Sequence, residues 1–206
     1  RLPGALATIV EYAFGAKAAA GGVLAAIGIA MQKGIARGIF SNEAGLGSAP
    51  IAAAAAKTNE PVRQGLVTMT GTFIDTIIVC TLTGLSIVMM GSYQVKGIEG
   101  VQVTTDAFKK GLSFLPAEVS AFILMVCLVF FAFTTILGWN YYGERCLEYL
   151  TNRNQKAVKV YRWLYILAVF IGPYMTVAAV WTIADIFNGL MAIPNIIALF
   201  VLSGVV

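Results

Sequence analysis

The sequence predicts an all-α membrane protein, built as a helical bundle in which one transmembrane helix is discontinuous. The first observation behind this prediction is composition. Of 206 residues, 59% are hydrophobic and 12% are charged, and the mean hydropathy is +0.83. Soluble domains carry about 25% charged residues, so an apolar excess this large has to face lipid. The second observation is a series of apolar blocks of membrane-spanning length, and the third is a polar, glycine-rich interruption within the first block.

We expect residues 1–206 to form a single transmembrane region with five spanning segments. These cover residues 16–56, 64–90, 116–144, 163–180 and 187–206. The first block is too long for one span of about 20 residues, and glycines and Pro50 break it in the middle. Gly172-Pro173 predicts a kink in the fourth span. Since the chain starts without methionine and stops within an apolar run, we expect a fragment of a longer protein.

The segments between the spans predict surface helices and an orientation. Residues 1–15 are typical of an interfacial helix, and residues 104–112 of a surface helix capped by Thr104 or Thr105. Alternate loops divide the basic residues into two unequal sets. The larger set is Lys57, Arg63, Arg145, Arg153, Lys156, Lys159 and Arg162, and the smaller is Lys96, Lys109 and Lys110. The larger set is expected on the cytoplasmic side of the cell inner membrane, so the broken segment enters from outside and leaves inside.

Composition also excludes several functional classes. There is no histidine, which removes the commonest general base and metal ligand, and no carboxylates pair at catalytic spacing. We therefore expect neither an enzyme nor a bound cofactor. Cys80, Cys127 and Cys146 lie singly in apolar stretches and indicate neither a disulfide framework nor a zinc site. The net charge of +4 is spread between apolar blocks, which favours the lipid bilayer over nucleic acid as a partner.

The interruption at residues 34–50 is the most informative segment. Unwound backbone at membrane depth is tolerated only where it is buried in protein or lines a wet cavity. Free carbonyls at the end of a first half-helix can coordinate a cation or an ammonium group, and free N–H groups at the start of a second can hold a carboxylate. A zwitterionic amino acid needs both. We expect Ser48 to cap the second half-helix, with Pro50 in its first turn.

Several side chains at the interruption are candidates for function. Arg37 and Glu43 cost roughly 2.5–3.5 kcal/mol each at membrane depth unless they are paired or wet. We interpret Glu43 as holding the geometry of the break through backbone donors and through Arg37, with a plain structural ion pair as the alternative. The remaining candidates are substrate ligands, namely Gly38, Phe40, Ser41 and Asn42, among which the Phe40 ring can close an apolar pocket over a small side chain.

The string Arg37-Gly-Ile-Phe-Ser-Asn-Glu-Ala-Gly-Leu-Gly-Ser-Ala-Pro50, followed by Ile51 and an alanine run, resembles the signature of the alanine/glycine:cation symporter family (sodium:alanine symporters). That family is similar in fold to the LeuT-like amino acid–polyamine–organocation superfamily, which has an inverted repeat. The resemblance implies that residues 16–56 are the sixth transmembrane helix and that the first five lie outside this chain. It also implies sodium-coupled symport of alanine or glycine by alternating access, with sodium, a small amino acid and the missing N-terminal helices as partners.

Two adjacent hydroxyls, those of Thr134 and Thr135, lie deep in the third apolar block. From the residues alone, each hydroxyl can simply bond the carbonyl four residues earlier. The family resemblance implies instead that Thr134 and Thr135 contribute to a sodium site, completed by helices outside this chain. It further implies that Thr135 and Trp139, four residues apart on one helical face, line the substrate cavity. Trp139 would then restrict the cavity to small side chains, and ordinary helix packing is its alternative role.

Asp75 is the other intramembrane acid, on one helical face with Thr72 and Thr76. Such a residue is a functional-site hypothesis by default, either for cation binding or for bracing the broken helix. A structural hydrogen bond to its hydroxyl neighbours is equally open. Asp185 and Asn188 are expected near the start of the fifth span, at an interface or a gate. The alternative function for the whole chain is an ion channel or another cation-coupled solute transporter.

Overall fold

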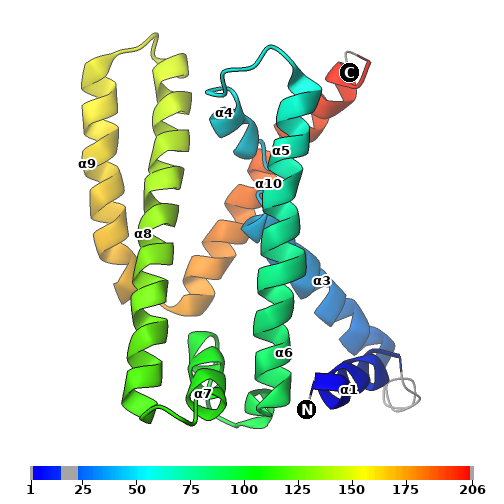
Figure 1. Cartoon of the computed structure of the whole chain (residues 1–206). Coiled ribbons are helices and arrows are strands. Elements are labelled where there is room, and N and C mark those ends of the chain that lie inside the picture. Colours follow the sequence, from blue (N-terminus) through cyan, green and yellow to red (C-terminus); the bar gives the residue numbers. More distant parts are fainter. Residues whose placement is uncertain (1, 15–22, 205–206) are drawn as a thin grey trace. The chain divides into compact units, whose positions relative to one another are not determined.

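The computed structural model describes residues 2–14 and 23–204, and every regular element in them is helical (Figure 1). Among these described residues, three helical runs are long and apolar enough to cross a membrane: residues 61–89, 117–150 and 177–202. Large apolar side chains along them, such as Phe130 and Phe200, are exposed. The chain is therefore a multi-pass all-α membrane protein, as the composition predicts.

The chain divides into two compact units, and each is described by itself. The first comprises residues 1–35 and 70–130, and the second residues 36–69 and 131–206. In the first unit, helix α6 (Thr81–Met89) packs against α1 (Leu2–Phe14) and α7 (Val101–Gly111). Between α5 (Pro61–Phe73) and α6 runs a π-helical segment, η1 (Ile74–Cys80), which contains Asp75. Such segments are rare and frequently lie at functional sites.

The surface helix of the first unit starts earlier than the sequence predicts. α7 begins at Val101 after Gly100, and no side chain caps it. Thr105, one of the two expected caps, instead donates its hydroxyl to the carbonyl of Val101 at 2.9 Å. Outside the membrane-spanning runs, the pKa of Asp106 is lowered, chiefly by its hydrogen bond with Lys110, whose ammonium lies 2.6 Å from the carboxylate.

The predicted interruption is present, although the start of the predicted span, residues 16–22, lies outside the described residues. α3 (Val23–Ser41) ends there, and α4 (Ala49–Ala53) begins after seven intervening residues. The Glu43 N–H donates to the carbonyl of Phe40 at 3.3 Å, and the Ala44 N–H donates to that of Ile39 at 3.1 Å. This pair of bonds is the Schellman ending of a helix, which requires a left-handed residue at the turn.

Glu43 occupies that left-handed position, with φ 51°. Glycine is the usual residue there, because a side chain in the left-handed region costs about 1 kcal/mol. Gly45 and Gly47 continue the irregular path with φ of 74° and 80°. A Cβ on Gly47 would come within 3.1 Å of the Asn195 side chain, so this glycine is required both by its conformation and by its neighbour.

The second half-helix is shorter than expected and is not capped as expected. α4 has 5 residues and Pro50 at its start, and the Ser48 side chain makes no capping hydrogen bond. After Ala53 the chain continues in tighter turns, with the N–H of Ala55 bonded to Ala52 and that of Ala56 to Ala53. The predicted role of Ser48 as a cap is therefore wrong, because the residue itself has helical φ and ψ of −76° and −46°.

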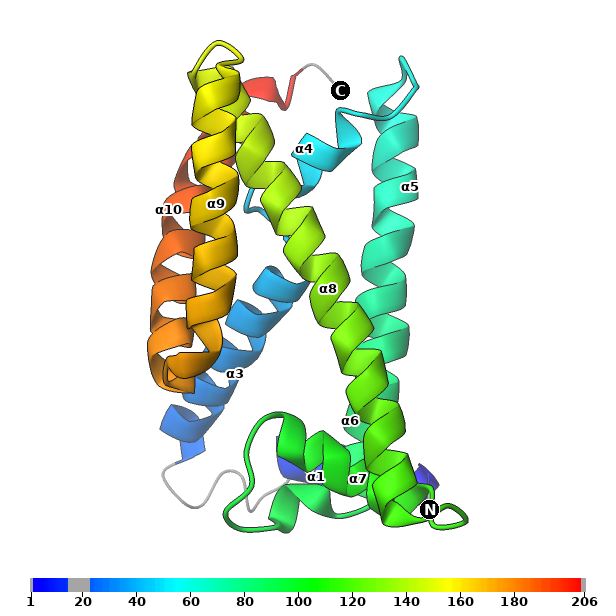
Figure 2. The same cartoon turned by 90° about the vertical axis from the view of Figure 1, so that its left-hand side faces the viewer.

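In the second unit, α8 (Ala117–Leu150) and α9 (Gln155–Ile171) form an antiparallel hairpin along the second half of α8 (Figures 1 and 2). The Glu144 carboxylate, 6% exposed, receives two hydrogen bonds from the Arg162 guanidinium, at 2.6 and 2.8 Å. The Tyr165 hydroxyl donates to the carbonyl of Ile136 at 2.9 Å. A bidentate pair of this kind fixes the register of the two helices.

The boundary between the fourth and fifth predicted spans is misplaced. α9 ends at Ile171, a short 3₁₀ turn covers Gly172–Tyr174, and α10 (Val177–Leu202) then runs without a break through the predicted gap. Gly172-Pro173 thus ends a helix and does not kink one, because Thr176 starts a new helix by accepting a hydrogen bond from the Ala179 N–H at 3.3 Å. Asp185 consequently lies inside α10 and not near its start.

The left-handed conformation of Glu43 predicts how substitutions at this position change the stability of the protein. Glu43→Gly should be more stable than Glu43→Ala by about 1 kcal/mol, because both variants lose the same side chain and only glycine relieves the backbone. The midpoint of thermal denaturation of the complete protein in detergent measures the difference. Gly47→Ala, which adds strain at the same break, should lower the midpoint. Equal midpoints for Glu43→Gly and Glu43→Ala would contradict the strained geometry.

Candidate functional site

The candidate site lies in the second unit, where the last turn of α3 meets α8 and α10. Aromatic rings from all three helices form its wall. The Phe40 ring stacks on that of Trp139, with centroids 6.2 Å apart and planes 15° from parallel. It also meets the Trp181 ring edge-on at 5.6 Å. On α8, the Tyr142 ring stands edge-on to Trp139 at 5.9 Å.

Arg37 pairs with an acid on α10. Its Nη2 lies 2.9 Å from Oδ2 of Asp185, and its guanidinium sits over the Trp181 ring, 3.6 Å from the centroid. Trp181 and Asp185 are four residues apart on one face of α10, so one arginine engages both. The expected Arg37–Glu43 contact is therefore wrong, because the α3 helix places the arginine beside α10 while the chain reverses at Glu43.

Glu43 turns toward α8 instead. Its carboxylate lies near the Tyr142 side chain. Tyr142 in turn lies against Trp139. The left-handed turn at Glu43 thus connects the break in the first helix to the aromatic wall. From the sequence, backbone N–H groups are expected to donate to the Glu43 carboxylate. Among the described residues, no such hydrogen bond is found.

The carbonyls at the end of α3 are largely engaged. The Gly38 carbonyl accepts from both the backbone N–H and the side-chain amide of Asn42, each at 3.0 Å. Those of Ile39 and Phe40 accept the two bonds of the helix ending. Each carbonyl has two lone pairs, so the Ile39 and Phe40 oxygens keep capacity for one further contact. The Asn42 amide therefore stabilises the break, which is a role the sequence did not indicate.

A cavity of about 390 Å³ is lined by residues of the break, α8, α9 and α10. Its lining includes Gly47, Ser48, Trp139, Tyr142 and Met191. The Ser48 hydroxyl is 1% exposed and makes no hydrogen bond with any described residue. Trp139 therefore borders this cavity and also stacks against the Phe40 ring.

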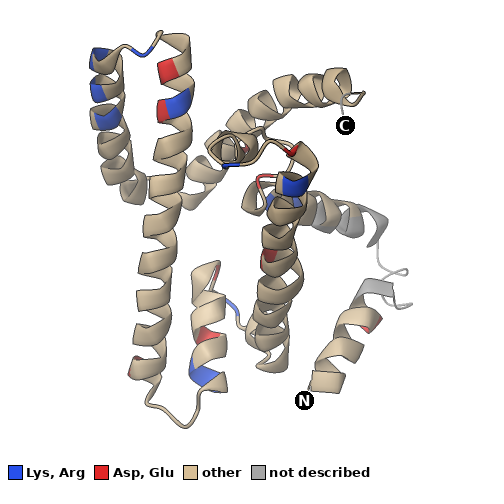
Figure 3. Cartoon of the chain, turned by 45° about the horizontal axis from the view of Figure 1, so that its top comes forward, with Lys and Arg blue, Asp and Glu red and all other residues tan. Residues whose placement is uncertain are grey.

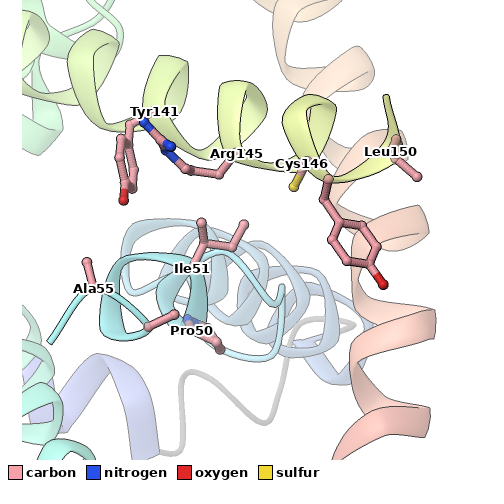
Figure 4. A pocket seen from close by; sticks show the side chains of 9 residues that line it. Pro50, Ile51, Ala55, Tyr141, Arg145, Cys146 and Leu150 are labelled. Atoms are coloured by element: carbon pink, nitrogen blue, oxygen red, sulfur yellow. The ribbon is translucent and has the colours of Figure 1, made fainter. Parts of the chain in front are cut away.

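A wider hollow of about 700 Å³ separates α4 from the end of α8 (Figure 4). Pro50, Ile51 and Ala55 form one side, and Tyr141, Arg145, Cys146 and Leu150 form the other. The Arg145 guanidinium lies 5.0 Å from the Tyr141 ring centroid. The small side chains of the alanine run therefore leave space beside α8 rather than packing tightly against it.

The threonine pair on α8 is exposed, and both hydroxyls donate to the carbonyl of Phe131, each at 2.9 Å. Thr135 thus bonds the carbonyl four residues earlier, as expected from the residues alone, whereas Thr134 bonds the carbonyl three residues earlier. This arrangement uses the hydroxyl hydrogens and leaves oxygen lone pairs of Thr134 and Thr135 available to a cation. Asp75 belongs to the first unit, at the beginning of η1 and half-buried, so the second unit itself does not contain it.

Sequence reasoning missed three members of this site. Trp181 and Tyr142 belong to the aromatic wall, and Ser48 belongs to the cavity behind it. Two of them carried a signal, since Trp181 precedes Asp185 by four residues and Tyr142 follows Trp139 by three, which are the spacings of one helical face. Nothing in the sequence distinguishes the buried hydroxyl of Ser48 from that of a capping serine.

Known proteins resemble this chain along its whole length. The model of the sodium:alanine symporter family matches residues 1–206. An uncharacterized transporter of Haemophilus influenzae is 53% identical over 210 residues, covering 100% of this chain and 44% of that protein. The sodium/alanine symporter AgcS of Methanococcus maripaludis is 50% identical over 203 residues, covering 98% and 43%. The probable sodium/glutamine symporter GlnT of Bacillus subtilis is 43% identical over 206 residues, covering 100% and 41%.

The chain thus spans less than half the length of the curated relatives it matches. No solved structure matches it. The relatives carry the names of transporters and symporters, not of enzymes. With a family model covering every residue and relatives at 43–53% identity, the chain belongs to the sodium:alanine symporter family.

Proposed function

We propose that this chain is the part of a sodium-coupled symporter that carries one broken helix and one cation-binding helix, in a LeuT-like arrangement. The cargo is a small neutral amino acid, alanine or glycine, and transport proceeds by alternating access across the cytoplasmic membrane. The observation that carries the proposal is the broken helix, which ends against the stacked rings of Phe40 and Trp139. Relatives named as alanine and glutamine symporters support a neutral amino acid.

The substrate's charged groups bind at the break. The carbonyl oxygens of Ile39 and Phe40 can each accept one more contact, which suits an ammonium group. Ser41 and Asn42 supply neutral polar side chains, and Gly38 lets the substrate approach the backbone closely. The aromatic wall then limits the side chain of the substrate, because the stacked Phe40 and Trp139 rings stand beside the break and oppose added bulk there.

The contacts of Arg37 form a gate on the outer side of this site. Arg37 precedes Phe40 by one turn, and the positive-inside rule places the beginning of the broken helix outside. Its bonds to Asp185 and Trp181 tie α3 to α10. Access from outside therefore requires these contacts to separate. Glu43 and Tyr142 hold the break to α8 on the inner side of the same ring cluster. For Asp75, the intramembrane acid of the first unit, the proposed role is cation binding or gating.

Sodium provides the driving force, and its site includes Thr134 and Thr135. A hard cation prefers oxygen ligands, and both hydroxyl oxygens keep lone pairs after donating to Phe131. Helices outside this chain supply the other ligands. Trp139 lies one turn beyond Thr135 on the same helix face, so ordering α8 around sodium also orders the substrate wall. No prosthetic group is needed for this coupling.

The sodium site is tested in proteoliposomes that contain the complete protein. Alanine uptake should follow an inward sodium gradient. In Thr134→Ala and Thr135→Ala the sodium concentration for half-maximal uptake should rise roughly tenfold or more, since losing a polar contact to a charge costs about 1.5–3 kcal/mol. Thr182→Ala is the matched control, because its hydroxyl makes the same kind of backbone bond, to Ala178 at 2.9 Å.

Two outcomes would contradict different parts of the proposal. Uptake that ignores the sodium gradient in the unmodified protein overturns sodium coupling. Uptake that follows the gradient, with unchanged sodium activation in both threonine variants, returns Thr134 and Thr135 to a purely structural role.

The aromatic wall predicts which sizes of substrate side chain the protein transports. Trp139→Ala should raise glutamine uptake relative to alanine uptake roughly tenfold or more, because excluding added bulk from an apolar pocket is worth about 1–3 kcal/mol. Competition by glutamine against labelled alanine measures the ratio. Trp163→Ala is the control, since that ring is exposed on α9. An unchanged ratio in Trp139→Ala would remove this residue from the substrate cavity.

A further inference from the structure

The cations of the α8–α9 hairpin fall into two groups. Arg145 and Arg162 are compensated within the hairpin, because Arg145 Nη1 lies 2.6 Å from Glu148 Oε2 and Arg162 holds the Glu144 carboxylate. Arg153, Lys156 and Lys159 are all exposed. Within the described part of the chain, no acidic side chain pairs with any of them. We refer to these three residues as the hairpin cation patch.

The patch lies at an unfavourable place for positive charge. Lys156 and Lys159 belong to the first two turns of α9, which Asn154 caps by accepting from the Lys156 N–H at 3.0 Å. The N-terminal end of a helix carries a partial positive charge and favours anions. Arg153 adds its charge from the adjoining loop, where it adopts a left-handed conformation with φ 62°. Figure 3 shows basic residues gathered at the start of α9 and in the loop before it. The patch therefore favours an anion that the described chain does not supply.

Exposed aromatic side chains place the patch at a membrane surface. Trp163 is 73% exposed and follows Lys159 by four residues on the same face of α9, and Tyr149 at the end of α8 is 85% exposed. Tryptophan and tyrosine with this exposure are typical of the membrane–water interface. A hollow of about 590 Å³ beside the loop is lined by Glu148, Tyr149, Leu150, Asn152 and Arg153. Beyond Trp163 the exposed face of α9 is apolar, with Leu164 and Leu167.

We propose that the hairpin cation patch binds the headgroup of an anionic phospholipid in the cytoplasmic leaflet. The phosphodiester pairs with the planar guanidinium of Arg153 and with the ammonium groups of Lys156 and Lys159. The acyl chains then lie along the apolar face of α9. Basic clusters just cytoplasmic of a spanning helix attract anionic lipid in this way. The inference does not depend on the transported substrate or the coupling ion.

The test uses the complete protein in nanodiscs of phosphatidylcholine with a minority of phosphatidylglycerol. Such discs have two equivalent leaflets, so any change in insertion direction leaves the measurement unaffected. In the double variant K156Q/K159Q, the enrichment of phosphatidylglycerol around the protein should fall roughly 25-fold, at about fivefold per neutralised charge. Lipid extraction and mass spectrometry of the purified discs measure the enrichment. K96Q/K109Q, which neutralises two lysines of the smaller basic set, is the matched control and should retain it.

Three outcomes overturn the proposal. The first is unchanged enrichment in K156Q/K159Q, and the second is an equal loss in K96Q/K109Q, which would show a response to net charge alone. The third is displacement of the lipid by inorganic phosphate at constant ionic strength, which would point to a free-phosphate site. The measurement is made at an ionic strength low enough to leave surface charge unscreened. The headgroup site is supported if K96Q/K109Q retains the phosphatidylglycerol enrichment and K156Q/K159Q loses it.

Discussion

The arrangement of the second unit depends on how a helix can stop inside an apolar environment. A backbone that leaves the helix there must satisfy its polar groups within the protein. This chain does so with the two helix-ending bonds to Ile39 and Phe40 and with the Asn42 amide on Gly38. The closure requires a left-handed residue, and the residue present is Glu43. Backbone strain of this kind persists only where surrounding contacts maintain it, and it concentrates at functional sites.

The closure also determines where the neighbouring side chains go. Arg37 and Phe40 lie on the last turn before the break and reach α10 and α8, through Asp185, Trp181 and Trp139. Glu43 reaches α8 after the break, through Tyr142. The segment around the break therefore contacts α8 and α10 before its turn and α8 after it. A change at the break alters the ion pair and the aromatic wall together, which is the property an alternating-access transporter needs at its binding site.

Sequence reasoning succeeded where a single physical rule decides the structure. Composition determined the membrane class, and the small residues of the segment 34–50 located the interruption. It failed where two rules compete. Gly172-Pro173 is compatible with both a kink and a helix end, and only the cap at Thr176 decides between them. Sequence proximity pairs Arg37 with Glu43, whereas its partner Asp185 is 148 residues away. That contact depends on tertiary packing.

The central claim is that the end of the broken helix, with Phe40 and Trp139, is the place where substrate binds. A density map of the complete protein with alanine and sodium bound tests it most directly. The account predicts alanine at residues 38–43, with its methyl group against the Phe40 and Trp139 rings and sodium beside the Thr134 and Thr135 hydroxyls. Alanine bound elsewhere, with the Phe40–Trp139 stack bordering no density, would contradict the account.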